Sequence, residues 1–427
     1  MFQLILPILL CFSWTGTGVA LESFSDRGNL APPIFGNTAI FDEIERLILL
    51  AQNRVCLSSM VLCSKALPWE DSADDNEDEI IRTQSLIKIE SALKKRPAKK
   101  IDFYILVNDS YISKFLNGLD IQNEVNKVVN CWIKNGVDKN KVHFKLAFYP
   151  NYFLGAMHSK MLLVDNTFLA ITGMNFDKQF NNGPHEPNWT DVMIVISGPI
   201  VKAAEEIFHY LWNQCGSSSL DEFIRLPTDH IHENYQDKII LLPQVGWDWP
   251  KLFINTPLKS PQNDAFGDLL QSANKNIRIM SPNINSPHLL QKLKEKASNK
   301  NLEIQIITGF KFNNWIYGNF KSKLLGMGLT NEDSIQELQN HNFCHLNVRY
   351  YTNSHGEIIQ GNEVDFNHSK ILIIDDKAII GSANQDYMSQ NHLTELNVLI
   401  LDANYIKNFL IPEFNRNWEK GKPAEYE

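Results

Sequence analysis

Two stretches of this 427-residue sequence repeat one pattern of polar residues, in which H-x-K-x4-D is followed by a glycine and an asparagine. The first copy consists of His158, Lys160, Asp165, Gly173 and Asn175. The second copy consists of His368, Lys370, Asp375, Gly381, Ser382 and Asn384. One copy alone would carry little information, whereas two copies in matching surroundings indicate a duplicated functional site. We expect Gly173, Gly381 and Ser382 to shape the backbone where the asparagines approach.

The residue types in the two copies suit chemistry at a phosphodiester. Two lysines can neutralise the non-bridging oxygens, and two asparagines can donate hydrogen bonds to them. One neutral imidazole can attack phosphorus and form a phosphohistidine, while the other, protonated, gives a proton to the leaving alkoxide. Water or an alcohol then resolves the intermediate. Histidine can hold either protonation state near neutral pH because its unperturbed pKa is about 6.5.

Strand periodicity separates the tasks of the residues within each motif. The runs MLLV and ILII that follow the lysines are typical of strands buried on both faces. Because side chains alternate along a strand, each His–Lys pair shares one face, whereas Asp165 and Asp375 point the other way. We therefore expect the two aspartates to anchor structure. The same alternation turns Ser159 and Ser369 away from the site, which argues against a serine nucleophile.

Each histidine also needs an acceptor that fixes its tautomer, and two carboxylates occupy matching places in the repeat. Asp191 and Glu395 begin the final strand-like runs of the two halves, DVMIVI and ELNVLI. A carboxylate bonded to Nδ1–H would leave Nε2 reactive. These carboxylates and the two histidines could instead bind zinc, but two lysines on the same faces would repel a cation. The sequence therefore predicts no metal and no other cofactor.

The segments around the motifs recur in the same order in both halves of the chain. The matched segments are 39–59 with 265–281, 101–107 with 302–308, and 142–150 with 345–352. The offset between matched segments drifts along the chain, as loop insertions would produce. Each half alternates helical and strand periodicity, which predicts an α/β fold made of two similar halves.

Four regions follow from this organisation. Residues 1–20 contain an apolar run and then small residues, the pattern of a cleaved secretory signal peptide; an uncleaved anchor or a buried strand is the alternative. Residues 36–215 and 261–427 form the first and second halves, and residues 216–260, which have no counterpart in the repeat, form the linker. The formal net charge of −9 argues against a large basic surface for nucleic acid.

The sequence resembles the phospholipase D superfamily, with both of its HKD motifs in one chain. The resemblance covers residues 37–418 and is most specific in HSKMLLVD, TGMN and HSKILIIDDKAIIGSAN; WTDVMIVISGPIV resembles bacterial cardiolipin synthases and related phospholipases. It implies that each half is a mixed sheet flanked by helices, with the active site at the interface of the halves. It also implies catalytic roles for His158, Lys160, Asn175, His368, Lys370 and Asn384. By this analogy His158 is the nucleophile and His368 the acid.

The sequence departs from the family pattern in ways that bear on function. The family's D-x-R-S after the second motif has Met388 in place of the arginine, and no stretch after the signal reaches transmembrane length. These departures favour a secreted or periplasmic enzyme that hydrolyses or exchanges phospholipid head groups at a membrane surface, with water or an alcohol as acceptor. Because one chain contains both halves, we expect a monomer. A metal-independent nuclease acting on nucleic acid and a cardiolipin synthase-like phosphatidyltransferase are the alternatives, because the superfamily shares one site among several substrates.

Overall fold

The computed structural model describes residues 21–62, 83–96, 99–110, 120–151, 155–181, 189–215, 237–247, 257–313, 329–341, 343–361 and 366–424. The expected signal peptide, residues 1–20, and much of the expected linker, residues 216–236 and 248–256, lie outside these ranges. Both assignments therefore stay predictions. Within the described ranges, no helix combines the length and the apolar composition that crossing a bilayer requires.

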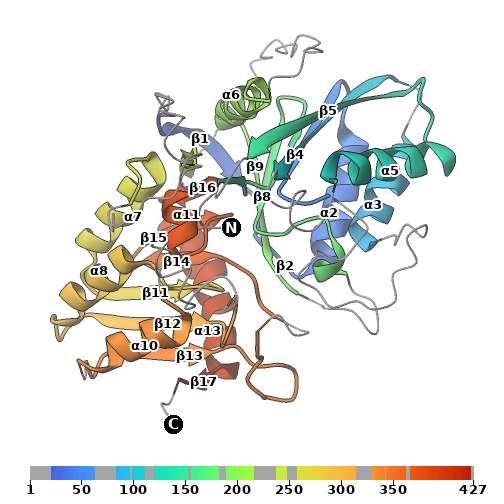
Figure 1. Ribbon diagram of the computed structural model, residues 1–427. Helices are drawn as coiled ribbons and strands as arrows, with labels where there is room; N and C mark the ends of the chain where they lie inside the picture. The colour runs from blue at the N-terminus through green and yellow to red at the C-terminus, as the bar shows by residue number, and fades with distance from the viewer. Residues whose placement is uncertain are drawn as a thin grey trace, which may run out of the picture.

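The first half is built on one sheet with the strand order β5-β4-β3-β7-β8-β9. Its strands are β3 (Arg54–Ser59), β4 (Ile101–Ser110), β5 (Val142–Asn151), β7 (Met161–Val164), β8 (Phe168–Thr172) and β9 (Val192–Ser197). The first three strands run parallel, and the sheet continues antiparallel from β3 through β7, β8 and β9. Its helices are α2 (Asn37–Leu50), α3 (Gln84–Lys95), α5 (Ile121–Lys134) and α6 (Ile200–Asn213) (Figure 1).

The second half repeats this arrangement, with the strand order β13-β12-β11-β14-β15-β16. Its strands are β11 (Asn276–Met280), β12 (Glu303–Thr308), β13 (Leu346–Tyr350), β14 (Ile371–Ile374), β15 (Lys377–Gly381) and β16 (Leu393–Ile400). Its helices are α7 (Pro261–Ser272), α8 (Pro287–Ala297), α10 (Asn331–Gln339), α11 (Tyr387–Asn391) and α13 (Ile411–Lys420). Because order and strand directions match those of the first half, the expected duplication of an α/β unit is confirmed.

Strands from outside the repeat join the two sheets. β1 (Phe24–Leu30) pairs with β10 (Asp237–Gln244) along most of its length and with β9 at its last two residues. β10 in turn pairs with β16, so part of the segment expected as a linker is a strand of the second sheet. The two-residue strand β6 (Ala156–Met157) leaves the first half and pairs with β16. The smaller elements are β2 (Ile34–Phe35), a 3-10 helix (Lys178–Phe180), α12 (Ala403–Tyr405), a π-helix (Ile406–Leu410) and β17 (Lys422–Pro423).

Local sequence signals account for where the elements begin and which face they bury. Ser260 and Ser286 cap α7 and α8 with their hydroxyls, and a proline follows each cap at the first helical position. In α2, Ile40, Ile44 and Leu47 recur at helical spacing and are almost fully buried. Figure 1 shows α3 and α5 near the outside of the first half, and α8 and α10 near the outside of the second. The motif histidines lie where the two halves meet, since each contacts a carboxylate of the other half.

The motif aspartates lie in the turns that follow β7 and β14. Asp165 and Asp375 both have a φ of 52°, the left-handed conformation that aspartate tolerates better than most residues. The carboxylate of Asp165 accepts the backbone N–H groups of residues 52–54 at 2.7–2.9 Å. That of Asp375 accepts those of residues 274–276 at 2.8–2.9 Å. Each aspartate therefore ties its motif to the start of the neighbouring parallel strand, away from the site.

Candidate active site

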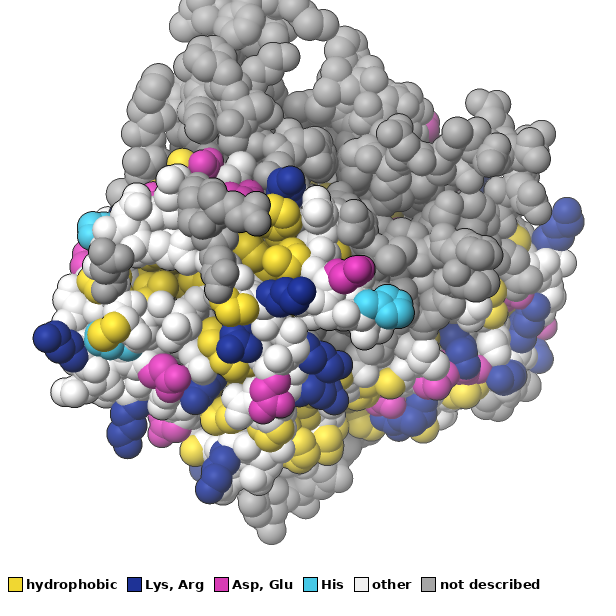
Figure 2. Space-filling view, turned by 90° about the horizontal axis from the view of Figure 1, so that it is seen from below, with side chains coloured by type: hydrophobic (Ala, Val, Ile, Leu, Met, Phe, Trp, Pro, Cys, Tyr) yellow, Lys and Arg dark blue, Asp and Glu magenta, His cyan; other side chains and the backbone are white. Residues whose placement is uncertain are grey.

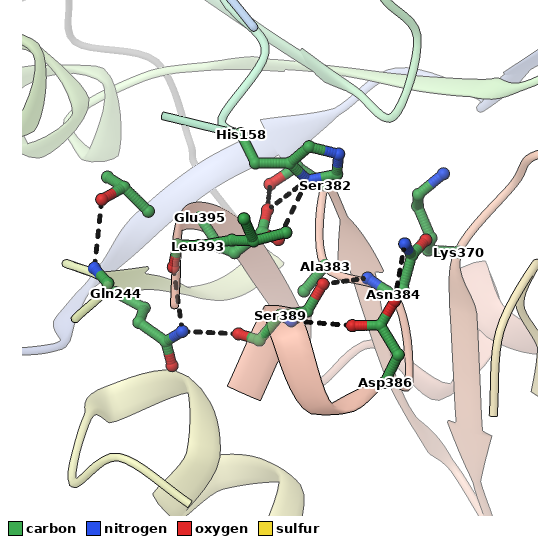
Figure 3. A network of polar contacts seen from close by, with 12 residues as sticks. His158, Gln244, Lys370, Ser382, Ala383, Asn384, Asp386, Ser389, Leu393 and Glu395 are labelled. Carbon is green, nitrogen blue, oxygen red and sulfur yellow. Dashed lines mark hydrogen bonds and ion pairs between the residues drawn. The ribbon is translucent and has the colours of Figure 1, made fainter. Parts of the chain in front are cut away.

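Each motif histidine contacts a carboxylate from the opposite half. His158, which follows β6 of the first half, lies with Nδ1 2.9 and 3.0 Å from the carboxylate oxygens of Glu395 on β16 (Figure 3). His368, which precedes β14, lies with Nδ1 3.0 Å from Oδ2 of Asp191, just before β9. All four residues are buried, with at most 7% exposure. A carboxylate at Nδ1 fixes each imidazole with Nε2 as its reactive atom.

Backbone hydrogen bonds between the halves hold each histidine beside its carboxylate. The N–H groups of His158 and Ser159 both donate to the carbonyl of Thr394, at 2.7 and 2.9 Å. The N–H of His368 donates to the carbonyl of Thr190 at 2.7 Å. Thr394 and Thr190 directly precede the two carboxylates in the sequence. The crosswise pairing therefore follows from how the halves pack, since neither half contains both members of a pair.

The two motif lysines are buried beside the histidines. Nζ of Lys370 lies 2.6 Å from Nδ1 and 3.1 Å from Nε2 of His368, and 3.9 Å from Oδ2 of Asp191. Nζ of Lys160 has no hydrogen-bond partner among the described residues. Burial lowers the pKa of Lys160 to about 7 and that of Lys370 to about 8. Lys160, whose Nζ has no such partner, and Lys370, whose Nζ lies beside His368 and Asp191, are suited to neutralising a bound phosphoryl group.

The strand register aligns the two motifs differently from the sequence pattern. β8 ends at Thr172, which pairs with Met193, two residues after Asp191. β15 ends at Gly381, which pairs with Asn397, two residues after Glu395. Thr172 is therefore the counterpart of Gly381, and Gly173 is the counterpart of Ser382. The sequence-based match of the two glycines is shifted by one residue because the turn after β7 is longer than the turn after β14.

This shift makes the two carboxylates unequal. The hydroxyl of Ser382 donates to Oε2 of Glu395 (Figure 3). At the corresponding Gly173, a Cβ would lie 2.6 Å from Oδ2 of Asp191, so no side chain fits there. Asp191 instead accepts the backbone N–H of Val192 at 2.7 Å. The expected structural role of Ser382 is thus a contact with the carboxylate that holds His158.

The motif asparagines lie at the end of the same loops. Asn175 and Asn384 are each 7% exposed, and their carboxamide oxygens have no hydrogen-bond partner among the described residues. Nδ2 of Asn384 donates to Oδ2 of Asp386 at 3.1 Å, and Asp386 also caps α11 by accepting the N–H of Ser389 at 2.7 Å (Figure 3). Asp386 was not among the predicted site residues, although its place two residues after the second asparagine is visible in the sequence.

Aromatic side chains enclose His368, and the sequence analysis missed them. The Trp189 ring stacks on the imidazole with centroids 5.3 Å apart, and Phe180 contacts it edge-on at 5.5 Å. Phe312 from the second half completes the wall at 6.2 Å. The one available signal was the position of Trp189, two residues before Asp191. These rings exclude water from His368 and strengthen the electrostatic interactions around it.

The titratable groups respond to this burial in different directions. Burial lowers the pKa of His158, and Glu395 opposes the shift. Burial together with Lys370 and Lys160 lowers the pKa of His368 well below its usual range. Burial raises the pKa of Asp191 to about 6, whereas attraction to His158 and Lys160 outweighs burial and lowers the pKa of Glu395. At neutral pH this leaves two neutral imidazoles, each beside an ionised carboxylate, with the two lysines offsetting most of the negative charge.

Comparison with known proteins places this geometry in a family. A family model described as "Cardiolipin synthase, PLD-like domain" matches residues 81–212 and 267–418, one segment in each half. The chain belongs to this phospholipase D-like family. Each matched segment contains one of the two motifs and one of the two orienting carboxylates. The resemblance that the motifs indicated is therefore confirmed across both halves.

Individual members of the family resemble the chain over part of their length. The chain is 23% identical over 266 residues to the probable cardiolipin synthase YwiE of Bacillus subtilis (strain 168), covering 62% of this chain and 46% of that protein. It is 23% identical over 270 residues to cardiolipin synthase 1 of Staphylococcus epidermidis, covering 62% and 48%. The chain thus spans about half the length of these curated relatives.

A solved structure shares the fold over nearly the whole chain. The crystal structure of the phosphatidylserine synthase of Haemophilus influenzae Rd KW20 superposes with a TM-score of 0.60. The two proteins are 15% identical, and the similarity covers 94% of this chain and 90% of that chain. At this identity the comparison shows a common fold, and the reaction of this chain has to be argued from its own site.

Proposed function

We propose that this chain is a phosphatidyltransferase of the cardiolipin synthase type, which moves a phosphatidyl group from one phospholipid to an alcohol. The observation that carries the proposal is the crosswise pair of histidine and carboxylate contacts, His158 with Glu395 and His368 with Asp191. This arrangement supplies one imidazole for attack and a second for proton transfer, and two buried lysines supply positive charge for the phosphoryl oxygens.

In the first step, Nε2 of His158 attacks phosphorus and the P–O bond to the leaving head group breaks. Nε2–H of His368 gives its proton to the departing alkoxide, so a phosphohistidine and a free alcohol result. His368 is neutral in the unliganded site, and the negative charge of the bound phosphodiester raises its pKa toward the protonated state. We assign the nucleophile to His158 because Glu395, held ionised by its surroundings, stabilises positive charge on that ring.

In the second step, an acceptor hydroxyl gives its proton to His368 while its oxygen attacks phosphorus and the P–N bond breaks. A second phospholipid as acceptor yields the transfer product, and water yields phosphatidic acid. The hydrolase that the sequence favoured would use the same residues and would differ only in the acceptor of this second step. The printed names of the relatives, cardiolipin synthases and a phosphatidylserine synthase, favour transfer instead. Secretion remains a prediction from residues 1–20, and association with a membrane surface remains a prediction from the expected phospholipid substrate.

A nucleic acid substrate finds less support. On the face shown in Figure 2, Lys and Arg side chains lie among Asp and Glu side chains, and no broad basic stripe is visible in the part of the chain drawn in colour. The formal net charge of −9 points the same way. A nuclease that tracks a strand needs many phosphate contacts, because its affinity comes mostly from releasing counterions.

The test is an assay of the full chain with vesicles containing radiolabelled phosphatidylglycerol in the presence of EDTA. We expect cardiolipin and glycerol in equimolar amounts from the wild type, and no product from His158→Ala or His368→Ala with unchanged circular dichroism. Phosphatidic acid as the main product would replace transfer with hydrolysis. Turnover near the wild-type rate in either variant would overturn the two-histidine scheme. A labelled oligonucleotide, incubated in parallel, tests the nuclease alternative.

A further inference from the structure

A cavity of about 530 Å³ lies on the second half, behind His368 and Asp191. It is enclosed by the segment that follows β13, by the end of α13 and by the residue that precedes Asp191. The residues that line it include Thr190, Tyr351, Asn353, Ser354, Asn367 and Lys420. Its volume falls within the range of about 300–1,000 Å³ that is usual for small-molecule sites.

One wall of the cavity is the backbone that positions the catalytic histidine. Thr190 and Asn367 form an isolated bridge between the halves, and each directly precedes a catalytic residue. Because side chains alternate along extended backbone, Thr190 and Asn367 face away from Asp191 and His368. The cavity is therefore separate from the catalytic centre, and the two sites share these two bridged extended segments as a common wall.

The described residues that line the cavity supply hydroxyl and carboxamide groups together with the side chain of Lys420, and none of them is Asp or Glu. A carboxylate that contacts this lining is that of Glu357, which accepts Nδ2–H of Asn353 at 3.2 Å. The hydroxyl of Tyr351, a residue only 4% exposed, is buried and has no hydrogen-bond partner among the described residues. Hydroxyls and amides beside one ammonium match a ligand with several hydroxyl groups and a phosphate.

The pseudo-symmetric position in the other half is closed by the chain itself. There Thr394 corresponds to Thr190, and its hydroxyl accepts the backbone N–H of Gly246 at 3.0 Å. The N–H of Trp247 then donates to the carbonyl of Asn391 at 2.9 Å. At Gly246 an added Cβ would collide with the backbone of residue 392, so the covering segment packs closely. Of the two equivalent positions, one is covered by the segment after β10 and the other opens into the cavity.

We propose that this cavity binds the glycerol phosphate unit of an anionic phospholipid head group or of a soluble glycerol phosphate, and that the bound ligand alters turnover at His368. Lys420 would pair with the phosphate, and the hydroxyls of Ser354 and Thr190 would contact the polyol. The effect on turnover rests on the proposed function, whereas the binding does not.

One hydrogen bond and one electrostatic interaction link the cavity to the catalytic centre. The first is the bond of 2.7 Å between the His368 N–H and the Thr190 carbonyl, because Thr190 lines the cavity. The second is Tyr351, whose pKa is raised by burial and further by the charge of Asp191. A ligand that displaces either residue changes the surroundings of the His368–Asp191 pair.

The binding test is calorimetric titration of the full chain with sn-glycerol 3-phosphate, and separately with vesicles of phosphatidylglycerol or of phosphatidylcholine. Lys420→Glu reverses a charge at the cavity, and Lys422→Glu makes the same change at an exposed residue outside it. We expect Lys420→Glu to weaken binding at one site at least tenfold and Lys422→Glu to stay within twofold of wild type. Equal isotherms for the wild type and Lys420→Glu would overturn the proposal.

The experiment also distinguishes a lipid head group from a soluble glycerol phosphate as the ligand, and it tests the cavity independently of the proposed transfer reaction. Binding of phosphatidylglycerol vesicles without binding of soluble glycerol phosphate assigns a lipid head group, and tight binding of the soluble ligand assigns a free metabolite. The titration needs no turnover, so it stands even if the transfer assay yields no product. Where transfer is observed, we expect sn-glycerol 3-phosphate to change its rate at least twofold in the wild type and not in Lys420→Glu.

Discussion

Replacing Lys160 by methionine is expected to abolish turnover and to make the protein more stable. The Lys160 side chain is completely buried, and its ammonium has no hydrogen-bond partner among the described residues. Burial lowers its pKa from 10.5 to about 7, although Glu395 and Asp191 favour the charged form. At about 1.4 kcal/mol per pKa unit, this difference corresponds to at most roughly 5 kcal/mol for holding the charged ammonium in the fold.

The net gain is smaller than this upper bound because the pKa shift compares charged with neutral lysine and omits the change in packing when methionine replaces the side chain. Glu395 keeps His158 and Ser382 as partners, and methionine keeps most of the length of the lysine side chain. We therefore expect Lys160→Met to raise the free energy of unfolding by about 2 kcal/mol at pH 6. Turnover is lost because the phosphoryl oxygens lose one of their two ammonium groups.

The pH dependence distinguishes this desolvation effect from a general improvement in packing. Between pH 7 and 10.5 the unfolded chain holds a proton on Lys160 that the folded chain has released, so the stability of the wild type rises with pH. Below pH 7 Lys160 is protonated in both the folded and the unfolded chain, and burying the charged ammonium then has its full destabilising effect. The advantage of Lys160→Met should thus shrink by about 2–3 kcal/mol between pH 6 and pH 9.

The assay is thermal and urea unfolding followed by circular dichroism at pH 6 and pH 9. Lys139→Met, which changes an exposed lysine, is the control and should shift stability by less than about 0.5 kcal/mol at either pH. A variant at position 160 that is less stable than the wild type at pH 6, or equally stabilised at both pH values, would refute the reasoning. Retained turnover would refute the role of the ammonium.

Three further predictions concern the carboxylates of the site and of the turns. kcat/KM should fall about tenfold per pH unit below pH 6, because protonated Asp191 no longer accepts Nδ1–H of His368; a profile that is flat from pH 5 to 7 would contradict this. Ser382→Ala should lower kcat about 10–100-fold, since Glu395 loses a donor to its ionised form and holds His158 less firmly; an unchanged kcat would show that the serine serves only packing. Asp375→Ala should lower the free energy of unfolding by about 3 kcal/mol in urea titrations, and Asp375→Asn by less. Hydrogen bonds from three backbone N–H groups outweigh burial and lower the pKa of Asp375, so this stabilisation is present above pH 4 and is lost as the pH falls further. Equal urea midpoints for the wild type and Asp375→Ala would rule out the anchoring role.

The fold and the anchoring aspartates were accessible from the sequence because their signals are local. The buried runs MLLV and ILII fixed the strand type, and alternation placed Asp165 and Asp375 on the side away from the histidines. The sequence alone aligned the residues of the two motifs correctly up to the aspartates but not at the glycines. A turn that differs in length by one residue moved Gly173 out of register with Gly381, and only strand pairing reveals such a shift.

The sequence by itself determined which groups do the chemistry, namely two histidines, two lysines and two carboxylates repeated in matching places. Only the tertiary structure decided which carboxylate serves which histidine. His158 and Glu395 are separated by 237 residues and His368 and Asp191 by 177, and no periodicity or spacing within one half specifies a partner in the other. The choice is made by packing, because β6 pairs with β16 and the Thr190 backbone pairs with that of Asn367, so the carboxylate of each half contacts the histidine of the other.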